Sequence, residues 1–525
     1  MGARIRKAVV FVWALAPSGW LAWQWRAVPQ LGLHHDDALY LVGAKSLAEG
    51  HGYRIESLPG SPFQTKYPPV FSALLTLVWR FDPRYPENSR LALVLSWLAL
   101  PPFLLALRAV FRDFGLGRRE AAFLTLAAAF YPVVCLLSTS VMSDLVFLSL
   151  LLASTRAAEK ALNGSSSRWL APAAGVIAGF AYLTRTAALV LAVTAPLCFL
   201  WRKQGRRAFL FLAGMLPFVA GWQVWVSTHL APTRDPALLY YTNYMALQRA
   251  TVRLDNLASV VWYNFDALLR SIGKLLVFDV ALRENVHLER ILGIAALAGA
   301  VRLVKRRSQL QYPAAAAGTA VLLLVYFYTA DERLCLPLYP LVLMGFWTEV
   351  KNCAAALVAS WRRCHVMDRA LAAGAALVLG GLGIFVGASY VVGDAVFLPA
   401  VYAACQTDRK SHESAYEWIR RTTHPQSTFY AYNDPLLYLH TGRKALGLTM
   451  PSGRIYTGEG EKKTDEFLRS IPQNACAHGV DHLLVTDSDF YREGSARLLR
   501  EVADRDPGLL PEYRSADAVI YRCVR

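Results

Sequence analysis

The sequence predicts a polytopic α-helical membrane protein that ends in a small α/β domain. Of the 525 residues, 55% are hydrophobic and 18% are charged, whereas a typical soluble domain is about 25% charged. Apolar runs long enough to span a bilayer recur from Val9 to Val392 and then stop. Beyond Gly393, strand-like and helix-like segments alternate. We therefore divide the chain into a transmembrane module, residues 1–398, and an extracytoplasmic domain, residues 399–525.

About eleven transmembrane helices are predicted in the first module. A spanning helix needs roughly 17–25 mainly apolar residues. Runs of this kind lie at residues 8–27, 90–111, 121–141, 145–162, 169–184, 186–201, 208–228, 289–304, 313–330, 334–350 and 370–393. Residues 262–285 are ambiguous and a tight turn separates Leu183 from Ala188, so the number of spans stays open by about two.

The Lys and Arg residues predict how these helices are oriented. They cluster at alternate connections between the spans, as expected of cytoplasmic loops. The clusters are Arg4/Arg6/Lys7, Arg108/Arg112/Arg118/Arg119, Arg156/Lys160/Arg168, Arg202/Lys203/Arg206/Arg207, Arg302/Lys305/Arg306/Arg307 and Lys351/Arg362/Arg363/Arg369. We therefore expect a cytoplasmic N-terminus and an external C-terminal domain. The first span is expected to stay as an uncleaved anchor, because Pro17 would directly follow the signal-peptidase site.

This arrangement also accounts for the formal net charge of +17, so no nucleic-acid partner is predicted. The short loops and the plain charge pattern favour a multi-pass protein of a bacterial inner membrane.

The C-terminal segment is expected to be an α/β domain of about 120 residues. Residues 414–421 and 434–442 read as helices, and residues 427–432, 480–487 and 516–524 read as strands. It contains no glycine-rich phosphate loop and no HExxH or GxSxG motif. Its role is left open between capping a cavity, holding an acceptor and stabilising the protein. Three of the eight cysteines, Cys405, Cys476 and Cys523, lie in this exported part, so at most one disulfide forms there, and Cys476–Cys523 is our guess at the pair.

The first predicted outer loop, residues 28–89, carries the most informative charges. Asp36 and Asp37 follow the first span, and Lys66 precedes a Pro-Pro pair that returns to apolar sequence. Charged groups are costly at a membrane boundary, which favours chemistry or substrate binding. The alternative is that they are ordinary interfacial residues of a loop.

Further charges embedded in apolar sequence are predicted at the same outer boundary. They are Asp144, Arg185, Asp331, Glu332 and Arg333. Five separate segments thus bring charges to one side, which favours a single polar cavity over isolated ion pairs that pin helix ends. Arg185 and Arg333 are suited to bidentate recognition of phosphate.

A long aromatic outer segment, residues 229–288, contains Tyr240, Tyr241, Tyr244 and Arg249. These residues either line a sugar-binding pocket or form an interfacial helix with an aromatic belt, and the sequence does not decide. His34 and His35 beside two aspartates suggest a divalent metal site as an alternative. Adjacent side chains point in different directions and no distant partner is evident, so neither a metal nor a cofactor is predicted.

Several of these segments together resemble a known family. They are Asp36-Asp37 with Tyr40, the AxxLxxGxGY pattern from Ala44 to Tyr53, Lys-Tyr-Pro-Pro at 66–69, SDLVF at 143–147, GFAYLTR at 179–185 and RLCLPLYP at 333–340. In order and spacing they are similar to the polyprenyl-phosphate-sugar-dependent membrane glycosyltransferases of the GT-C fold, in the protein mannosyltransferase and aminoarabinose transferase branch. The resemblance covers about residues 1–350. Asp37 departs from it, since this branch usually carries Glu there.

The resemblance implies transfer of a hexosyl or pentosyl group from a polyprenyl phosphate, such as undecaprenyl phosphate, during glycosylation of the cell envelope. Asp36 would be the general base of a single, inverting displacement. Asp37 would orient the acceptor or stabilise charge on the sugar. Lys66, with Arg185 or Arg333, would neutralise the departing lipid phosphate. The substrate-binding residues expected on this basis are Lys66, Tyr67, Arg185, Arg333, Asp144, Tyr40 and Tyr244.

Two other functions remain open from the sequence. One is a non-catalytic transporter or flippase of lipid-linked sugars, although no internal repeat is evident. The other is a glycan ligase or oligosaccharyltransferase that moves a preassembled glycan. The acceptor, whether lipid, glycan or protein, is not indicated.

Overall fold

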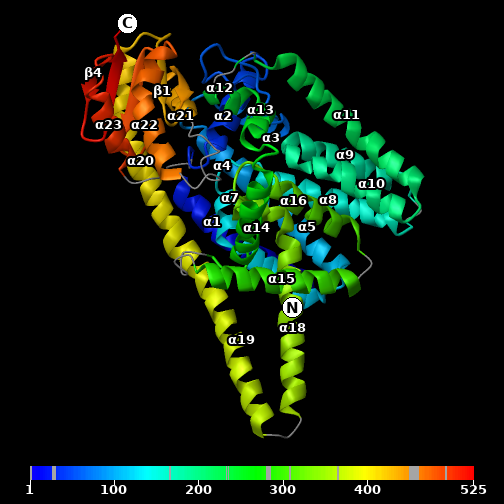
Figure 1. The fold of residues 1–525 in the computed structure, drawn as a ribbon. Coiled ribbons are helices and arrows are strands. Elements are labelled where there is room, and N and C mark those ends of the chain that lie inside the picture. The colour runs from blue at the N-terminus through cyan, green and yellow to red at the C-terminus, as the bar shows by residue number, and fades with distance from the viewer. Residues whose placement is uncertain are drawn as a thin grey trace.

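A computed structural model describes residues 3–26, 31–164, 167–231, 233, 236–278, 285–306, 309–362, 366–448, 460–490 and 494–524. Among the described residues up to Val392 the regular elements are helices, and a small mixed domain lies nearer the C-terminus (Figure 1). The basic residues Arg307 and Arg363 lie outside the described residues.

The helices of the first module are α1 (Ala3–Trp25), α2 (Asp36–Ala48), α3 (Val70–Phe81), α4 (Ser89–Trp97), α5 (Leu100–Asp113), α6 (Arg118–Ala129), α7 (Pro132–Ser138), α8 (Asp144–Leu162), α9 (Leu170–Thr184), η1 (Thr186–Val190), α10 (Leu191–Trp201) and α11 (Gly205–His229). They continue with α12 (Pro236–Thr242), α13 (Tyr244–Thr251), α14 (Leu257–Lys274), α15 (Val286–Arg306), α16 (Gln311–Leu324), α17 (Glu332–Cys335), η3 (Leu336–Leu338), α18 (Tyr339–Trp361) and α19 (Val366–Val392).

The predicted number of eleven spans is not confirmed. By length and composition, four described helical stretches can cross a membrane: Ser89–Asp113, Gly205–His229, Glu332–Trp361 and Arg369–Thr422. The bent pair α6–α7, with a 65° break, makes a fifth if it is one span. Several other predicted runs fold as apolar helices of at most 17 residues, such as α9 and α16. At 1.5 Å per residue such helices reach less than about 26 Å, short of the roughly 30 Å of hydrocarbon.

Close backbone contact holds two of these helices together. A Cβ on Gly175 of α9 would lie 2.0 Å from the carbonyl oxygen of Phe211 of α11, and a Cβ on Gly214 would lie 2.4 Å from the carbonyl oxygen of Pro172. Neither position accepts a side chain without moving the backbone. Small residues of this kind let helices pack closely in a membrane, where apolar burial alone does not drive association.

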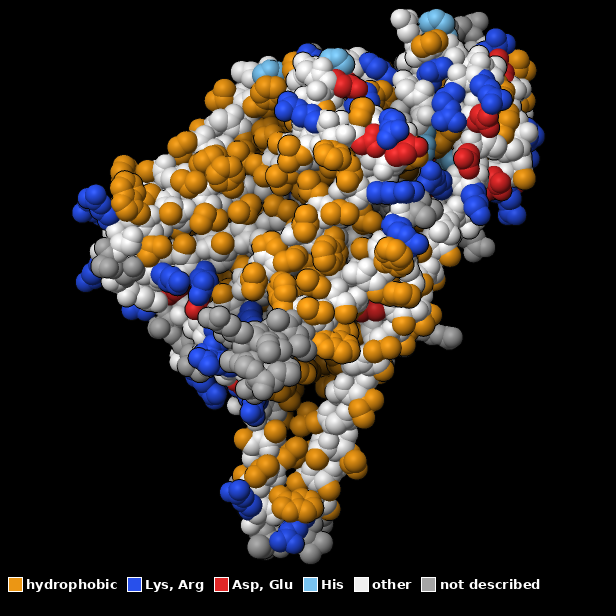
Figure 2. All heavy atoms as spheres, turned by 180° about the vertical axis from the view of Figure 1, so that it is seen from behind, with side chains coloured by type: hydrophobic (Ala, Val, Ile, Leu, Met, Phe, Trp, Pro, Cys, Tyr) orange, Lys and Arg blue, Asp and Glu red, His pale blue; other side chains and the backbone are white. Residues whose placement is uncertain are grey.

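The surface of the module is apolar around its middle. Figure 2 shows a broad face of hydrophobic side chains between groups of charged side chains at the two ends of the molecule. Exposed large side chains on this module include Leu77, Phe123, Val193, Phe209 and Ile291. Such a surface belongs in lipid, and the chain is a membrane protein.

One continuous helix joins the two parts of the chain. Arg369–Thr422 comprises most of α19, a short π-helical segment η4 (Gly393–Phe397) and α20 (Leu398–Thr422). The boundary predicted at residue 398 therefore falls within a helix, and the domain continues a long helix instead of following a flexible linker. Together α18 and α19 form an apolar hairpin that points away from the C-terminal domain (Figure 1).

The C-terminal domain is built on a five-stranded sheet with strand order β2-β1-β3-β5-β4. Its strands are β1 (Thr428–Ala431), β2 (Lys444–Gly447), β3 (His482–Thr486), β4 (Leu509–Arg514) and β5 (Ala518–Cys523), and its helices are α21 (Asp434–Thr441), α22 (Gly460–Ala477) and α23 (Ser495–Ala503). The β1 strand is parallel to β2 and β3, and β5 is antiparallel to β3 and β4. The predicted strands and helices all form, whereas β2, β4, α22 and α23 were not predicted.

A disulfide joins the end of α22 to β5. It links Cys476 to Cys523, whose Cα atoms are 5.5 Å apart, and Cys405 is free. This is the pair guessed from the sequence. An α/β domain with a disulfide fits an oxidising compartment.

The predicted first outer loop, residues 28–89, packs against the C-terminal domain through its described residues. Leu39 of α2 and the loop residues Ile55 and Leu58 share a buried apolar cluster with Tyr430 of β1 and Leu446 of β2. In Figure 1 the domain lies beside α2 and α12 at one end of the molecule. The start of α2 is thereby enclosed by both parts of the chain.

Candidate functional site

The two adjacent aspartates at the start of α2 have different partners. Asp37 is fully buried, and its carboxylate accepts backbone N–H bonds from Gly32 at 2.9 Å, His34 at 3.3 Å and Ala38 at 2.5 Å. Asp36 faces the other way, accepts a hydrogen bond from the Tyr67 hydroxyl and forms an ion pair with Arg333. Asp37 therefore shapes the loop, while Asp36 faces the charged centre.

Four charged side chains alternate in sign across the site. The Arg333 guanidinium lies 2.9 Å from Asp36 and 3.3 Å from Asp144, and Arg185 lies 2.6 Å from the same Asp144. Asp144 begins α8, Arg185 follows the last residue of α9, and Arg333 lies on α17. Segments far apart in sequence thus meet in one cluster, as the sequence led us to expect. Nearby, the Tyr40 hydroxyl lies 2.9 Å from Ser143 Oγ.

Lys66 is the cation of this site that forms no ion pair among the described residues. Its Nζ lies 3.3 Å from the ring centroid of Tyr240, 4.8 Å from that of Tyr67 and 4.9 Å from that of Tyr244. Burial lowers the pKa of Lys66 to about 7, although the negative charges of Asp36 and Asp434 oppose this change. Lys66 is therefore a half-protonated ammonium near neutral pH, held by aromatic faces.

The aromatic segment that follows α11 forms a wall of this site. Tyr240 and Tyr244 contact Lys66 as described above, and the Tyr244 hydroxyl lies 2.7 Å from that of Tyr326. Tyr241 is 1% exposed and turns toward the C-terminal domain. Of the two alternatives left open by the sequence, the arrangement favours the pocket wall.

The other two acids beside Arg333 have local partners. Asp331 accepts the N–H of Leu334 at 2.7 Å and so caps the short helix α17. Glu332 lies 3.7 Å from Lys274. Neither forms an ion pair with the four-charge cluster among the described residues.

Sequence reasoning missed the contribution of the C-terminal domain. Asp434, at the start of α21, forms contacts with His35 and Tyr241 next to Asp36. The only local signal was an Asn-Asp-Pro sequence, which is typical of a helix start and says nothing of a distant partner.

An apolar groove of about 370 Å³ opens close to Arg185. It is lined by Tyr53, Pro69, Leu183, Pro217, Phe218, Gly221, Trp222 and Trp225. Leu183 lies two residues before Arg185, and the Tyr53 hydroxyl donates to the carbonyl of Tyr67 at 3.0 Å. The groove therefore adjoins the charged cluster and provides apolar walls for a hydrocarbon chain.

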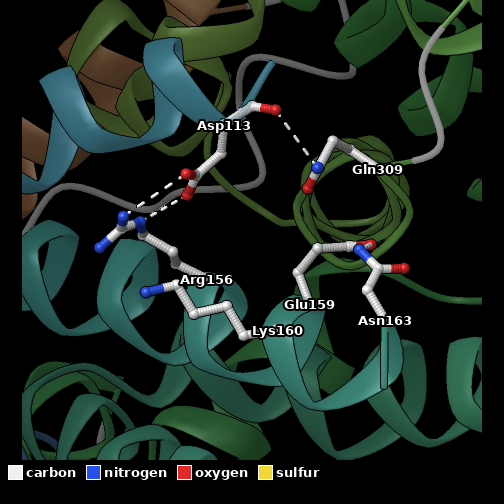
Figure 3. A pocket seen from close by; sticks show the side chains of 6 residues that line it. All are labelled: Asp113, Arg156, Glu159, Lys160, Asn163 and Gln309. Carbon is white, nitrogen blue, oxygen red and sulfur yellow. Dashed lines mark hydrogen bonds and ion pairs between the residues drawn. The ribbon is translucent and has the colours of Figure 1, made fainter. Parts of the chain in front are cut away.

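A second cavity of about 410 Å³ is lined by charged and polar side chains (Figure 3). Its residues are Asp113, Arg156, Glu159, Lys160, Asn163 and Gln309. Arg156, Glu159 and Lys160 lie in the second half of α8, whose first residue is Asp144, and Asn163 directly follows that helix. At 1.5 Å per residue these side chains lie roughly 18–28 Å along the helix from Asp144, so this cavity is far from the charged site.

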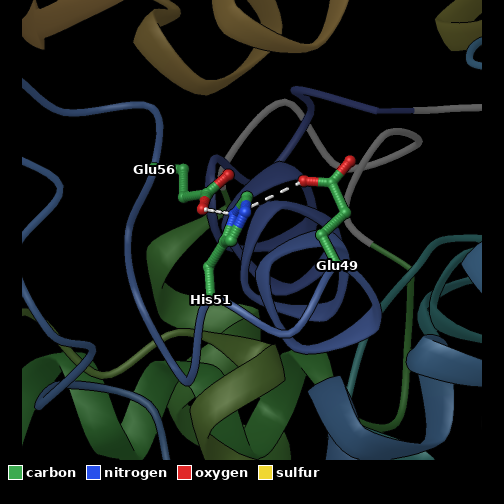
Figure 4. A group of neighbouring side chains, drawn as sticks. All are labelled: Glu49, His51 and Glu56. Atoms are coloured by element: carbon green, nitrogen blue, oxygen red, sulfur yellow. Dashed lines mark hydrogen bonds and ion pairs between the residues drawn. The ribbon is translucent and has the colours of Figure 1, made fainter.

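One group of described side chains has the composition of a metal site. Figure 4 shows His51 between Glu49 and Glu56, with His51 Nδ1 at 3.7 Å from Glu49 and 2.6 Å from Glu56. Imidazole and carboxylates suit a divalent cation. Lys45 already pairs with Glu49 at 2.8 Å, and the group lies beyond the far end of the 13-residue helix α2, roughly 20 Å from Asp36. The alternative metal site at His34 and His35 does not form such a group among the described residues.

Comparison with solved structures identifies the fold. No protein-family model matches the sequence, and no curated protein matches it. The structure of ArnT from Cupriavidus metallidurans bound to undecaprenyl phosphate aligns over 99% of this chain and 98% of its own, with 14% identity and a TM-score of 0.57. The chain has the fold of ArnT. The apo structure of ArnT aligns over the same shares, again with 14% identity and with a TM-score of 0.53.

The ArnT likeness confirms the GT-C fold expected from the sequence, and at this identity it establishes the fold alone. The oligosaccharyltransferase AglB from Archaeoglobus fulgidus, in complex with an inhibitory peptide and a dolichol-phosphate, aligns over 99% of this chain and 74% of its own. Its identity is 12% and its TM-score 0.48, and nothing is concluded from it.

Proposed function

We propose that this protein transfers a sugar from a polyprenyl-phosphate carrier to an acceptor at the outer face of the membrane. The observation that carries the proposal is the environment of Lys66. In the alternating cluster two guanidiniums balance two carboxylates, so Lys66 is the cation left to receive an anion. A lipid phosphate is an anion that reaches a membrane-boundary site of this kind.

The donor would bind with its phosphate at Lys66 and its prenyl chain in the apolar groove. The groove and Lys66 are connected through Tyr53 and Tyr67, whose contact joins the two regions. ArnT, which has the same fold over nearly the whole chain, was solved with undecaprenyl phosphate bound. Tyr240 and Tyr244 would pack against the sugar, because aromatic faces suit the apolar faces of sugar rings.

Asp36 would be the general base. The acceptor oxygen or nitrogen attacks the anomeric carbon, the bond from that carbon to the phosphate oxygen breaks, and the acceptor proton passes to Asp36. Free polyprenyl phosphate then leaves. A single base and a preorganised phosphate site suffice for one displacement with inversion.

To accept a proton in this role, Asp36 needs a higher pKa than it has in the free protein. Burial raises its pKa, but Arg333, Lys66 and the Tyr67 hydrogen bond outweigh burial and hold the pKa of Asp36 well below its ordinary value. Such a carboxylate is a weak base in the free protein. A bound phosphate would draw Arg333 and Lys66 toward itself and add negative charge, and both effects raise the pKa of Asp36 toward a useful value.

Asp37 and Asp144 are assigned supporting roles. The three N–H bonds accepted by Asp37 fix the loop before α2, which sets the direction of Asp36. Asp144 forms ion pairs with both Arg333 and Arg185 and so fixes the positions of the two guanidiniums. Arg185 would add positive charge beside the phosphate.

The orientation proposed is that of the sequence analysis, with a cytoplasmic N-terminus, an external C-terminal domain and placement in a bacterial inner membrane. Its support is the separation of the two ends of α8. Asp144 begins that helix in the charged site, and Arg156 and Lys160 lie near its other end with the basic residues that mark cytoplasmic loops.

The test uses the full-length protein in nanodiscs, a panel of labelled polyprenyl-phosphate sugars and a cell-envelope extract as acceptor. We expect release of free polyprenyl phosphate together with label in an acceptor. In proteoliposomes, movement of intact donor between leaflets without release would instead establish a transporter. Transfer of a preassembled glycan but of no single sugar would establish a ligase or oligosaccharyltransferase.

A further inference from the structure

A residue of the C-terminal domain reaches the loop that carries Asp36. Asp434 is the first residue of α21 and is 0% exposed. Its Oδ1 atom lies 3.0 Å from Nε2 of His35, the residue before Asp36. The same Oδ1 accepts a hydrogen bond from the Tyr241 hydroxyl at 2.5 Å, and that hydroxyl lies 3.2 Å from His35 Nε2. Three segments that are distant in sequence thus share one buried polar contact.

This contact leaves little freedom for the three groups. A Cβ on Gly447 of β2 would lie 2.1 Å from the Tyr241 hydroxyl and 2.8 Å from Asp434 Oδ1, so the strand backbone presses directly on the pair. On the other side, a Cβ on Gly32 would lie 2.4 Å from Leu436 of α21. His35 itself has a φ of +56°, a conformation that side-chain-bearing residues rarely adopt unless their surroundings hold them.

The contact affects the positions of both Asp36 and Lys66, the two groups of the proposed chemistry. His35 precedes Asp36, so its position sets where α2 begins and where the base points. Tyr241 follows Tyr240, the ring that lies 3.3 Å from Lys66. The Asp434 carboxylate also acts on Lys66 through space, together with Asp36, and Arg333 acts in the opposite sense.

Asp434 has one further unusual feature. Its second oxygen, Oδ2, is buried without a hydrogen-bond partner among the described residues. An incompletely satisfied buried carboxylate is costly in a folded protein. A neutral asparagine or an apolar residue would be the more stable choice if the only task were to dock two domains.

We infer that Asp434 is a positioning residue for the sugar-transfer site. Through His35 and Tyr241 it fixes the loop that carries Asp36 and the aromatic wall that holds Lys66. The C-terminal domain is thereby a working part of the site, not merely a cap over it. This inference rests on the proposed function.

The test compares Asp434→Asn with Asp517→Asn in the full-length protein. Asparagine keeps an oxygen in place but removes the charge. Asp517 is exposed in the same domain, which makes it a matched control. For Asp434→Asn we expect a loss of roughly tenfold in kcat/KM for donor. We also expect the alkaline limb of the pH profile to move to lower pH, because Lys66 loses a stabilising negative charge. A purely structural role would not move that limb.

Hydrogen–deuterium exchange gives a readout that needs no activity. In Asp434→Asn we expect faster exchange of amides in residues 31–48 and 236–244, and no change in Asp517→Asn. Unchanged exchange together with wild-type kinetics would overturn the inference. If the wild type transferred no sugar but the exchange still rose, the proposed function would fail while the positioning contact stood.

A second variant guards against misfolding. Tyr241→Phe removes the hydroxyl that bonds to Asp434 and leaves the ring in place. The same kinetic and exchange changes are expected, and the double variant should show little more than either single change. Fully additive losses would overturn a shared contact.

Discussion

Replacing Lys66 by methionine removes a cation that has no ion pair within the described part of the site, while keeping a flexible side chain of similar length on the tyrosine rings. Because Lys66 is half-buried and its Nζ forms no ion pair among the described residues, its charge is free to pair with a bound anion such as the proposed donor phosphate. A hydrogen bond to a charged group contributes about 1.5–3 kcal/mol net. The corresponding loss in kcat/KM for donor is roughly 10- to 150-fold.

The same residue predicts a pH dependence with a definite sign. The pKa of Lys66 is lowered to about 7, so the cation is present below that pH and is lost as the pH rises through it. The profile of kcat/KM reports the free enzyme. It should therefore fall above pH 7, with about a tenth of the protein still carrying the cation at pH 8.

Lys66→Arg is the control, because a guanidinium stays charged over this range. It should remove the alkaline limb while keeping measurable activity. The assay is release of polyprenyl phosphate from pH 5.5 to pH 9 in nanodiscs. Either a methionine variant within threefold of the wild type, or a wild type without an alkaline limb, would refute the assignment of Lys66 to the phosphate.

Three further changes test other parts of the structure. Asp144→Ala removes the carboxylate between two half-buried guanidiniums, of which only Arg333 keeps an ion-pair partner among the described residues, Asp36, and should destabilise the protein by about 3 kcal/mol, measured as a loss of thermal stability in nanodiscs. Gly221→Leu fills the apolar groove, where a Cβ meets nothing within 4 Å, and should weaken binding of long-chain donors but not of short-chain analogues. Gly374→Leu, equally open on α19, is its control. Replacing Cys476 and Cys523 by alanine opens a loop with a sequence separation of 47 and should lower domain stability by about 4 kcal/mol, seen in denaturant unfolding.

Each of these has an outcome that would contradict it. Unchanged melting of Asp144→Ala would mean that the ion pairs are not holding the helices together. Equal losses for long and short donors in Gly221→Leu would separate the groove from the prenyl chain. Unfolding that is the same with and without reductant in the wild type would show that the disulfide contributes nothing.

The charged cluster could be predicted from the sequence for a simple physical reason. A charge in an apolar run stands out, and alternating loop charges assign each one to a face of the membrane. Asp36, Asp144, Arg185 and Arg333 were placed on one side in this way, and the structure brings them within ion-pair distance. The direction in which the Asp37 side chain points could not be predicted, because it depends on hydrogen bonds from three backbone N–H groups around the start of α2.

The length of the helices was harder to predict. Hydropathy marks apolar residues but not where a helix ends. The single span predicted at residues 121–141 is divided by a 65° break between α6 and α7. Strand β4 was missed because Pro511 and the polar residues around it read as a loop. Proline is tolerated there because β4 is an edge strand.

The docking of the two parts was beyond sequence reasoning. His35 and Asp434 are separated by 399 positions, and no local sequence pattern around either residue predicts a contact with the other. Such contacts arise only when the loop and the domain have each folded and their surfaces meet. The polar residues at the junction would otherwise pass for ordinary surface side chains.

The most direct test of the central claim is the release of polyprenyl phosphate by the wild type and by Asp36→Asn. Donor binding is followed in parallel, and Asp517→Asn serves as the control. Asparagine keeps the shape of the side chain and one of the two oxygens that accept from Tyr67 and Arg333, but it cannot take a proton. We expect donor affinity to be kept within about threefold, because the phosphate binds Lys66, and release to fall by about 10²- to 10⁴-fold. Release at the wild-type rate by Asp36→Asn, with donor bound, would contradict the account.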